Sequence, residues 1–235
     1  MNIAPFIFIW LLATFSMSWF GYVYRPNAEL SRQEPFKDPI TAAVYPVGRS
    51  GEAMQGAEVY RAQGCAACHT QQVRPADEGN DLGRGFGIRR TVATDYMLDC
   101  PPQLGAIRLG PDLANFGLRK NTNDVAWIYL HLLKPKALVE RSNMPPYPYL
   151  FEKVLANSGH PGAISIPSET KYEFVPRDEA KQLAAYLVSL KNEGSVFEAP
   201  IKRPSTGTNA PAGGTNAPAG TNAPVSAANT NAQAK

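Results

Sequence analysis

The pattern of hydrophobic and polar positions predicts helices separated by loops. Residues 3–24 are uncharged and almost wholly apolar, and about 22 helical residues rise roughly 33 Å, enough to cross a bilayer. Residues 51–63, 124–133 and 176–191 place apolar side chains at helical spacing, as amphipathic helices do. The stretches between them are rich in Gly and Pro, which is typical of loops. The pattern therefore predicts a mainly α protein with one membrane-spanning helix.

The residues at the ends of the amphipathic helices match known capping and stop preferences. Gly64 ends the first helix, because glycine readily leaves the helical conformation. Thr122 or Asn123 can cap the second helix, and Pro135 stops it. Pro176 suits the first turn of the third helix, because its fixed φ angle is already helical.

The apolar stretch at residues 3–24 is interpreted as a retained membrane anchor. Trp19, Tyr22 and Tyr24 lie near one end, where aromatic side chains meet the membrane surface. The alternative is a cleaved signal peptide, which would need a basic residue before its apolar core and a small-residue cleavage site. No basic residue precedes Arg25, so we expect the anchor to be retained.

Composition limits the partners and the domain organisation. The chain has 235 residues, a net charge of +3 and no basic block, so nucleic acid is not an expected partner. After residue 205 the sequence repeats Thr-Asn-Ala-Pro without any aromatic residue, and such a segment cannot bury enough apolar area to fold. The predicted organisation is an anchor at 1–24, a linker at 25–50, one domain at 51–195 and a disordered Pro/Ala/Thr/Asn-rich tail at 196–235.

Residues 65–69 read Cys-Ala-Ala-Cys-His, which is the attachment motif of a c-type haem. Each thiol can bond covalently to one vinyl group of the porphyrin, and the adjacent histidine can reach the iron. A zinc site would need a second ligand pair, but the only other cysteine is Cys100. A redox-active Cys-x-x-Cys pair would not require the histidine. The motif therefore predicts one covalent haem c held by Cys65, Cys68 and His69.

The second axial ligand of the iron is expected to be Met144. It lies in Ser-Asn-Met-Pro-Pro-Tyr-Pro at residues 142–148, where the prolines impose extended or turn geometry that can hold a thioether rigidly. Other methionines lie too close before the motif or in a polar segment, and lone histidines are most often solvated. These alternative ligands are Met54, Met97, His131 and His160. An open iron site is the remaining alternative.

These features resemble a class I cytochrome c. In that fold an N-terminal helix with a small residue crosses a C-terminal helix that bears a Leu-x-x-Tyr pair. Gly56 and Tyr60 stand at such positions in the first amphipathic helix, and Leu183 and Tyr186 stand in the last. The resemblance implies a class I cytochrome c-like domain with long loops, placed after the single N-terminal transmembrane helix.

The same family places a Gly-Pro-x-Leu turn after the haem motif, and residues 110–113 read Gly-Pro-Asp-Leu. By this resemblance, the carbonyl of Pro111 accepts the proton from the far ring nitrogen of His69. Such a bond would fix the tautomer of the imidazole and raise its basicity as a ligand.

Four motifs read together resemble a narrower family. They are Gly-Ala-Glu-Val-Tyr at 56–60, Gly-Cys-Ala-Ala-Cys-His-Thr-Gln-Gln-Val-Arg-Pro at 64–75, Gly-Pro-Asp-Leu at 110–113 and Asn-Met-Pro-Pro-Tyr-Pro-Tyr-Leu at 143–150. Behind one anchor, they are similar to subunit II of cbb3-type cytochrome c oxidase, the membrane-anchored monohaem cytochrome of a haem–copper oxygen reductase. The resemblance covers roughly residues 1–195.

The resemblance implies a role in electron transfer. The expected partners are a donor, either a further cytochrome c subunit or a soluble cytochrome, and the haem–copper catalytic subunit as acceptor. Oxygen reduction and proton pumping belong to that catalytic subunit, so no residue here is assigned a catalytic role.

Haem attachment implies a location in the bacterial cytoplasmic (inner) membrane, with the haem domain on the periplasmic face. Arg25, Arg32 and Lys37 follow the anchor and would favour the opposite orientation. Three dispersed basic residues are a weak topological signal, however, and long domains translocate largely regardless of charge.

Three features have both a functional and a plainer interpretation. Arg74 and Arg119 are candidate partners of the haem propionates, or else ordinary surface arginines. Residues 76–105 form an insertion that we interpret as a subunit-contact loop, with a solvated excursion as the alternative. Cys100 is either a free buried thiol or paired with another chain.

Other functions are compatible with the same motifs. The first is the anchored cytochrome subunit of a nitric oxide reductase, and a stand-alone membrane-anchored electron carrier is related to it. A haem peroxidase would need an open iron site and usually a second haem motif. A scaffold subunit with a structural haem is the last alternative.

Overall fold

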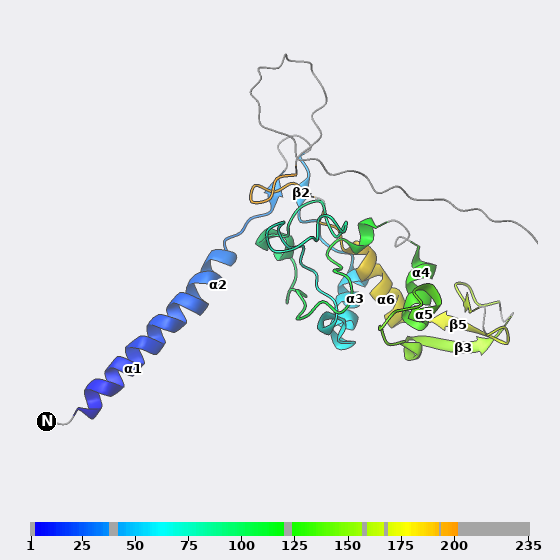
Figure 1. Cartoon of the computed structure of the whole chain (residues 1–235), viewed down its shortest axis with the longest axis horizontal. Helices are drawn as coiled ribbons and strands as arrows, with labels where there is room; N and C mark the ends of the chain where they lie inside the picture. Colours follow the sequence, from blue (N-terminus) through cyan, green and yellow to red (C-terminus); the bar gives the residue numbers. More distant parts are fainter. Residues whose placement is uncertain are drawn as a thin grey trace, which may run out of the picture. The chain divides into compact units, whose positions relative to one another are not determined.

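The fold combines an N-terminal helix with a mostly helical domain that carries a small sheet (Figure 1). The structure described here is a computed structural model. The structure describes residues 3–37, 42–119, 124–156, 159–166, 169–192 and 194–201. Most of the predicted tail at 196–235 lies outside these residues, so its disorder stays a prediction.

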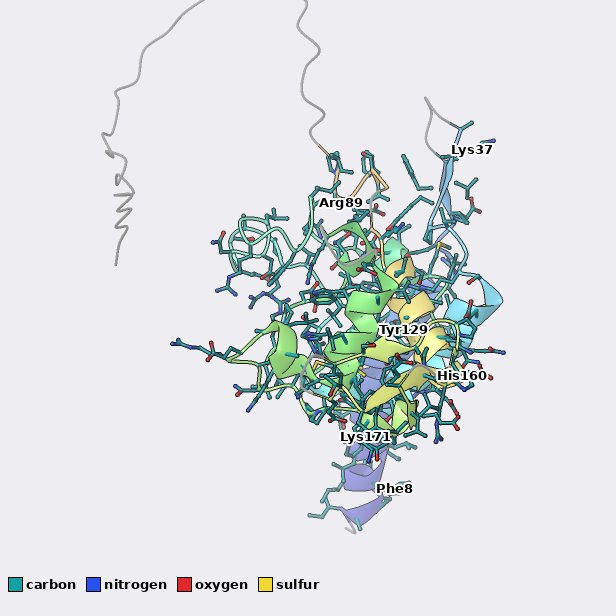
Figure 2. The ribbon with its side chains drawn as sticks, turned by 90° about the vertical axis from the view of Figure 1, so that its right-hand side faces the viewer. Phe8, Lys37, Arg89, Tyr129, His160 and Lys171 are labelled. Carbon is teal, nitrogen blue, oxygen red and sulfur yellow. The ribbon has the colours of Figure 1, made fainter. Side chains whose placement is uncertain are left out.

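The N-terminal helix is longer than the predicted anchor. It comprises α1 (Ala4–Trp19), a π-helical turn (Phe20–Tyr24) and α2 (Arg25–Leu30). Together they form one helix of 27 residues with a mean hydropathy of 1.7, long and apolar enough to cross a membrane. Its side chains are exposed, as that of Phe8 shows (Figure 2). The linker predicted from residue 25 therefore begins with helix, because Pro26 fits a first helical turn.

The rest of the predicted linker also contains ordered structure. Strands β1 (Phe36–Lys37) and β2 (Val44–Tyr45) pair antiparallel. Tyr45 is buried in a small apolar cluster with Val92, Val196 and Ala199. The boundaries predicted at residues 50 and 195 therefore cut through a packed unit. The short strands escaped prediction because two residues show no alternation.

Two helices far apart in sequence form the centre of the domain. Helix α3 (Gly51–Ala62) lies beside α6 (Asp178–Ser189) (Figure 1). At Gly56 a Cβ would lie 2.7 Å from Cβ of Tyr186, so only glycine allows this approach. The rings of Tyr60 and Tyr186 are 5.3 Å apart. This is the helix crossing that the resemblance implied, while the complete class I cytochrome c fold stays a prediction.

Helix α4 (Val125–Leu133) matches its predicted range but has a different cap. The side chain of Asp124 accepts a hydrogen bond of 2.9 Å from the backbone N–H of Ala126. The predicted caps, Thr122 and Asn123, lie outside the described residues. The short helix α5 (Pro135–Leu138) follows directly, with proline in its first turn.

A three-stranded antiparallel sheet was not predicted. Its strands are β3 (Phe151–Leu155), β4 (Ile164–Ser165) and β5 (Tyr172–Pro176), in the order β3-β5-β4. Pro176 ends β5 opposite Phe151, so its prediction as a helical residue was wrong. Helix α6 begins after Arg177, and its acidic first turn favours the positive end of the helix.

The insertion at 76–105 is fastened to the domain by buried charge. Arg89 Nη2 donates to Asp95 Oδ1 at 2.7 Å, with 4% and 0% of the two side chains exposed. Tyr45 Oη donates to the same oxygen at 2.6 Å, and Arg89 Nε donates to the carbonyl of Gly194 at 2.7 Å. The insertion is therefore not merely a solvated excursion, although its contact with another subunit stays a prediction.

Candidate haem site

The Cys-x-x-Cys-His motif forms a tight turn at the end of α3. Gly64 adopts a φ of 69°, a left-handed conformation that glycine enters without strain and that ends the helix. A single 3₁₀ turn, Cys65–Ala67, follows. The backbone N–H groups of Cys68 and His69 both donate to the carbonyl of Cys65, at 3.1 and 2.9 Å. The turn thus presents two thiols and an imidazole within five residues.

The imidazole of His69 is oriented by the chain 42 residues further on. Its Nδ1 lies 2.8 Å from the carbonyl oxygen of Pro111, and a carbonyl can only accept, so Nδ1 carries the proton. This is the contact that the resemblance implied. Burial lowers the pKa of His69, and the charge of Arg119 lowers it further against the effect of the Pro111 bond. A neutral ring with its proton on Nδ1 offers Nε2 to a metal.

Two glycines leave the space that this arrangement needs. A Cβ at Gly110 would lie 2.7 Å from Nδ1 and 2.9 Å from Nε2 of His69, so any larger residue would displace the ring. Gly105 has a φ of 85° and packs against the backbone of Thr70. On the side of Gly105 and Gly110, the His69 segment therefore packs against backbone without intervening side chains.

The loop that carries Met144 faces the same motif. Met144 and Cys65 are half-buried and pack on the same apolar core, and so does Tyr147. Burial raises the pKa of Tyr147 to about 12, and the nearby thiols of Cys65 and Cys68 contribute. Tyr147 N–H also donates to the carbonyl of Leu132 at 2.8 Å, which ties the loop to α4. Tyr147, three residues after Met144, thus lies near the thiols, while the role of Met144 as a ligand stays a prediction.

Tyr147 is a site residue that sequence reasoning missed. An aromatic residue three positions after the methionine in a Pro-rich loop was the available signal. Next to it, Tyr149 Oη donates to Gln63 Oε1 at 2.6 Å and joins the loop to the end of α3.

The alternative iron ligands are placed less favourably. Met54 is 61% exposed on α3, Met97 is half-buried in the insertion, and His160 is exposed (Figure 2). His131 was expected to be solvated, and that expectation was wrong. Its ring stacks on Trp127 at 4.8 Å, and its buried Nδ1 has no hydrogen-bond partner in the described part of the chain.

His131 lies near the site. Burial lowers its pKa, and a positive charge on His69 would lower it further. Helical periodicity alone placed this residue on α4 but could not reveal which side of that helix faces the core.

The two candidate propionate partners differ in their contacts. Arg119 is half-buried, donates to the carbonyl of Asp112 and lies 5.0 Å from the ring of Phe86. Arg74 instead donates to the buried carboxylate of Asp81, from Nη2 at 3.0 Å and from Nε at 3.2 Å. Arg119 acts on His69 electrostatically, so it lies close to the site. Arg74 has a carboxylate partner within the chain, and both propionate roles stay predictions.

The chemistry of Cys65 disfavours a thiol redox pair. Burial raises the pKa of Cys65 to about 11, so the free thiol would remain protonated at neutral pH. Redox-active Cys-x-x-Cys pairs depend on a lowered thiol pKa. Cys100 is exposed in the insertion, so the expectation of a buried free thiol was wrong, and its pairing with another chain stays a prediction.

Comparison with known families decides the relationship. Residues 45–204 match the family described as cytochrome c oxidase, mono-haem subunit/FixO. The chain belongs to this family. The match covers more than half of the chain and includes the motif, the 110–113 turn and the Met144 loop. No curated protein matches the sequence.

Family membership confirms the resemblance to subunit II of the cbb3-type oxidase. The mono-haem oxidase subunit is a component of an oxidase complex, and its family implies one haem. The residues present fit that group, since the Cys-x-x-Cys-His turn carries an imidazole oriented by Pro111, and the loop of Met144 packs on the same core as Cys65. No second Cys-x-x-Cys-His motif occurs in the sequence.

Proposed function

We propose that this chain is the electron-transfer subunit of a cbb3-type haem–copper oxidase. It accepts electrons from a donor cytochrome and passes them to the catalytic subunit. The orientation of His69 by Pro111 beside two cysteine thiols carries the proposal, because it prepares an axial ligand rather than a thiol redox pair. A bound haem c supplies a one-electron iron couple at this site.

Each site residue has a proposed task. Cys65 and Cys68 would hold the porphyrin through thioether bonds, and His69 would bind the iron through Nε2. Met144 would provide the second axial ligand through its thioether sulfur, and its proline-bound loop holds it in place. An iron held by both His69 and Met144 would have no open position for oxygen, so the subunit would relay electrons and leave oxygen chemistry to its partner.

The surroundings of Met144 favour a methionine over the other candidates. The loop packs on the core and is hydrogen-bonded to α3 and α4 through its tyrosines. His131 is the runner-up, because it is half-buried with its Nδ1 unpartnered in the described part of the chain, but its ring is stacked face to face on Trp127. Turning it toward a metal would give up that stacking.

The surface beside the motif suits a permanent protein partner. The backbone of residues 104–110 runs along the motif, with Ala106 N–H donating to the carbonyl of Ala66 at 3.0 Å. Leu104, Ile107 and Leu109 on this segment are 41%, 53% and 75% exposed. The centre of a stable interface is more apolar than the rest of a protein surface, and these three side chains supply exposed apolar area. We propose that the haem–copper catalytic subunit covers it.

The N-terminal helix is proposed to anchor the subunit in the bacterial cytoplasmic membrane. Ala4–Leu30 is long and apolar enough for a single span. The haem domain then lies on the periplasmic face, where covalent attachment of haem c takes place. Washing membranes with high salt should leave the chain in the membrane fraction, and removing residues 1–30 should release it.

Isolation of the native complex tests the proposed function. The complex is purified from membranes through a tag on this chain, and its redox spectrum and metal content are measured. The proposal predicts haem c, haem b and copper in one complex. A complex with non-haem iron and without copper would instead indicate the nitric oxide reductase alternative. A haem c chain isolated without other subunits would indicate a stand-alone carrier.

A further inference from the structure

A buried charge cluster joins the residues after the haem motif to the turn that orients His69. Its members are the carboxylates of Asp81 and Asp112, the guanidinium of Arg108 and the hydroxyl of Thr70. Both carboxylate side chains are 0% exposed, and the side chain of Arg108 is 15% exposed. Burying such groups costs free energy unless their hydrogen bonds are satisfied, so their contacts need an explanation.

Asp112 forms the direct bridge within this cluster. Its Oδ2 accepts from Thr70 Oγ1 at 2.6 Å and from the backbone N–H of Gln72 at 2.7 Å. Its Oδ1 accepts from the backbone N–H of Ala114 at 2.9 Å. The backbone adds a parallel contact, because the N–H of Leu113 donates to the carbonyl of Thr70 at 2.7 Å. The residue that follows His69 is therefore bound to the residue that follows Pro111.

The contacts of Asp112 hold together the two residues that follow His69 and Pro111, directly beside the His69 hydrogen bond. His69 precedes Thr70, and Pro111 precedes Asp112, so the bond of 2.8 Å from His69 Nδ1 to Pro111 lies beside the bond of 2.6 Å from Thr70 to Asp112. Two short adjacent bonds between the same two strands of chain restrain the distance and angle of both.

Arg108 balances the charge and completes the bridge. Its Nε donates to Thr70 Oγ1 at 2.8 Å, and its Nη1 donates to Asp81 Oδ1 at 2.6 Å. Its Nη2 lies 3.3 Å from Asp112 Oδ2. The hydroxyl of Thr70 therefore accepts from Arg108 while it donates to Asp112, and this orients its proton toward the carboxylate.

We propose that Asp112, acting through Thr70, is a positioning residue that holds the Pro111 carbonyl on His69. The inference rests on the proposed haem site. Asp112 and Thr70 then set the basicity of His69. A stronger hydrogen bond to its Nδ1–H makes the imidazole a better electron donor to iron. A better donor stabilises the oxidised iron, so loosening the bridge raises the midpoint potential.

The experiment distinguishes a positioning role from an effect of charge by including a substitution that leaves the net charge unchanged. Thr70→Val removes the hydroxyl with almost no change in shape or net charge, and Asp112→Asn removes the charge of the bridge. Asp81→Asn removes a charge from the same cluster without touching residues 110–114. Thr91→Val is the matched control, because the hydroxyl of Thr91 donates at 3.3 Å to the carbonyl of Val73 outside the cluster.

Two quantities are measured on the full-length holo-protein in detergent. The first is the exchange rate of the His69 Nδ1 proton, followed by NMR in the reduced, diamagnetic state. The second is the midpoint potential from a mediated redox titration. Thr70→Val and Asp112→Asn should raise the exchange rate by roughly tenfold and should both shift the potential upward. Thr91→Val should leave both quantities unchanged. Thr70→Ser keeps the hydroxyl and should keep the wild-type exchange rate.

Several outcomes would overturn the inference. One is an unchanged exchange rate in Thr70→Val, which decides the matter even if Asp112→Asn fails to accumulate. Another is an equal shift of potential in Asp112→Asn and Asp81→Asn with none in Thr70→Val, which would reveal a pure charge effect. If the wild-type His69 ring showed no haem-shifted resonances, the proposed haem site itself would fail, and that result is distinct from the others.

Discussion

Gly110 packs directly against the imidazole of His69. A Cβ at this position would lie 2.7 Å from Nδ1, closer than real side chains tolerate. The residue that precedes Pro111 therefore determines whether the ring can reach the Pro111 carbonyl. The glycine of the 110–113 turn is required for the space beside the His69 ring.

Gly110→Ala should displace the His69 ring and break its hydrogen bond to Pro111. Because second-layer contacts of this kind typically change ligand affinity by about 10–100-fold, we expect a weaker axial bond and a lower yield of correctly ligated haem. Visible spectra and haem content per chain measure this effect. Gly48→Ala is the control, since a Cβ there meets nothing within 4 Å and should leave both unchanged. Wild-type spectra in Gly110→Ala would show that the ring does not need this space.

Cys65→Ala and Cys68→Ala should each remove one thioether bond to the haem. We expect a weakly held or absent haem, and so less haem retained on a denaturing gel than in the wild type, because one of the two thioether bonds is lost. Haem staining of the gel is the measurement. Cys100→Ala is the matched control, because this exposed thiol lies outside the motif, and it should keep full staining. Full covalent haem in both motif variants would contradict the assignment.

Gly56→Ala should destabilise the crossing of α3 and α6. The added methyl group would overlap the carbonyl of Gln182 and lie 2.7 Å from Cβ of Tyr186, so the helices must separate. Overpacking of this kind costs about 1–3 kcal/mol, measurable as a lower free energy of unfolding in urea. Gly51→Ala, in the open first turn of the same helix, should have no such cost. Equal stabilities of the two variants would mean that the helices do not approach at Gly56.

The central helices and the haem motif could be predicted because their signals are local. Helical spacing, with a glycine stop for α3 and a proline stop for α4, placed both helices within a few residues, and five adjacent residues define the motif. The turn at 110–113 required family resemblance, because nothing near Pro111 in the sequence reveals that it meets His69.

The missed parts depend on contacts between distant segments. Strand β5 ends at Pro176, a residue that local preference assigned to a helix, because pairing with Phe151 outweighs that preference. His131 was expected in solvent, because a lone histidine carries no sign of what its helix packs against. The burial of Asp81 likewise depends on Arg108, 27 residues away.

Asp81 should make stability depend on pH in acid. Burial alone would raise its pKa, but hydrogen bonds from Arg74 and Arg108 outweigh this and hold the pKa well below its ordinary value of 3.8. A carboxyl with a lower pKa in the folded chain stabilises it above the unfolded pKa, and this contribution is lost as the pH falls through the folded value. Stability should therefore decline below about pH 4, with a slope from this group of at most about 1.4 kcal/mol per pH unit.

Urea unfolding of Asp81→Asn between pH 3 and pH 7 tests this expectation. The variant should be less stable than the wild type at pH 7, and the difference should shrink toward pH 3. Glu58→Gln is the control, because its carboxylate pairs with Arg61 on the exposed face of α3, where ion pairs contribute little. A constant difference between Asp81→Asn and the wild type across this range would rule out the carboxyl as the source.

The ligand set of the iron is the central claim, and the sulfur-to-iron charge-transfer band at the red end of the oxidised spectrum tests it most directly. Thioether ligation by Met144 predicts this band in the wild type and its loss in Met144→Ala, while haem stays covalently attached through Cys65 and Cys68. Met97→Ala should keep the band. Survival of the band in Met144→Ala, with its loss in Met97→Ala, would contradict the account.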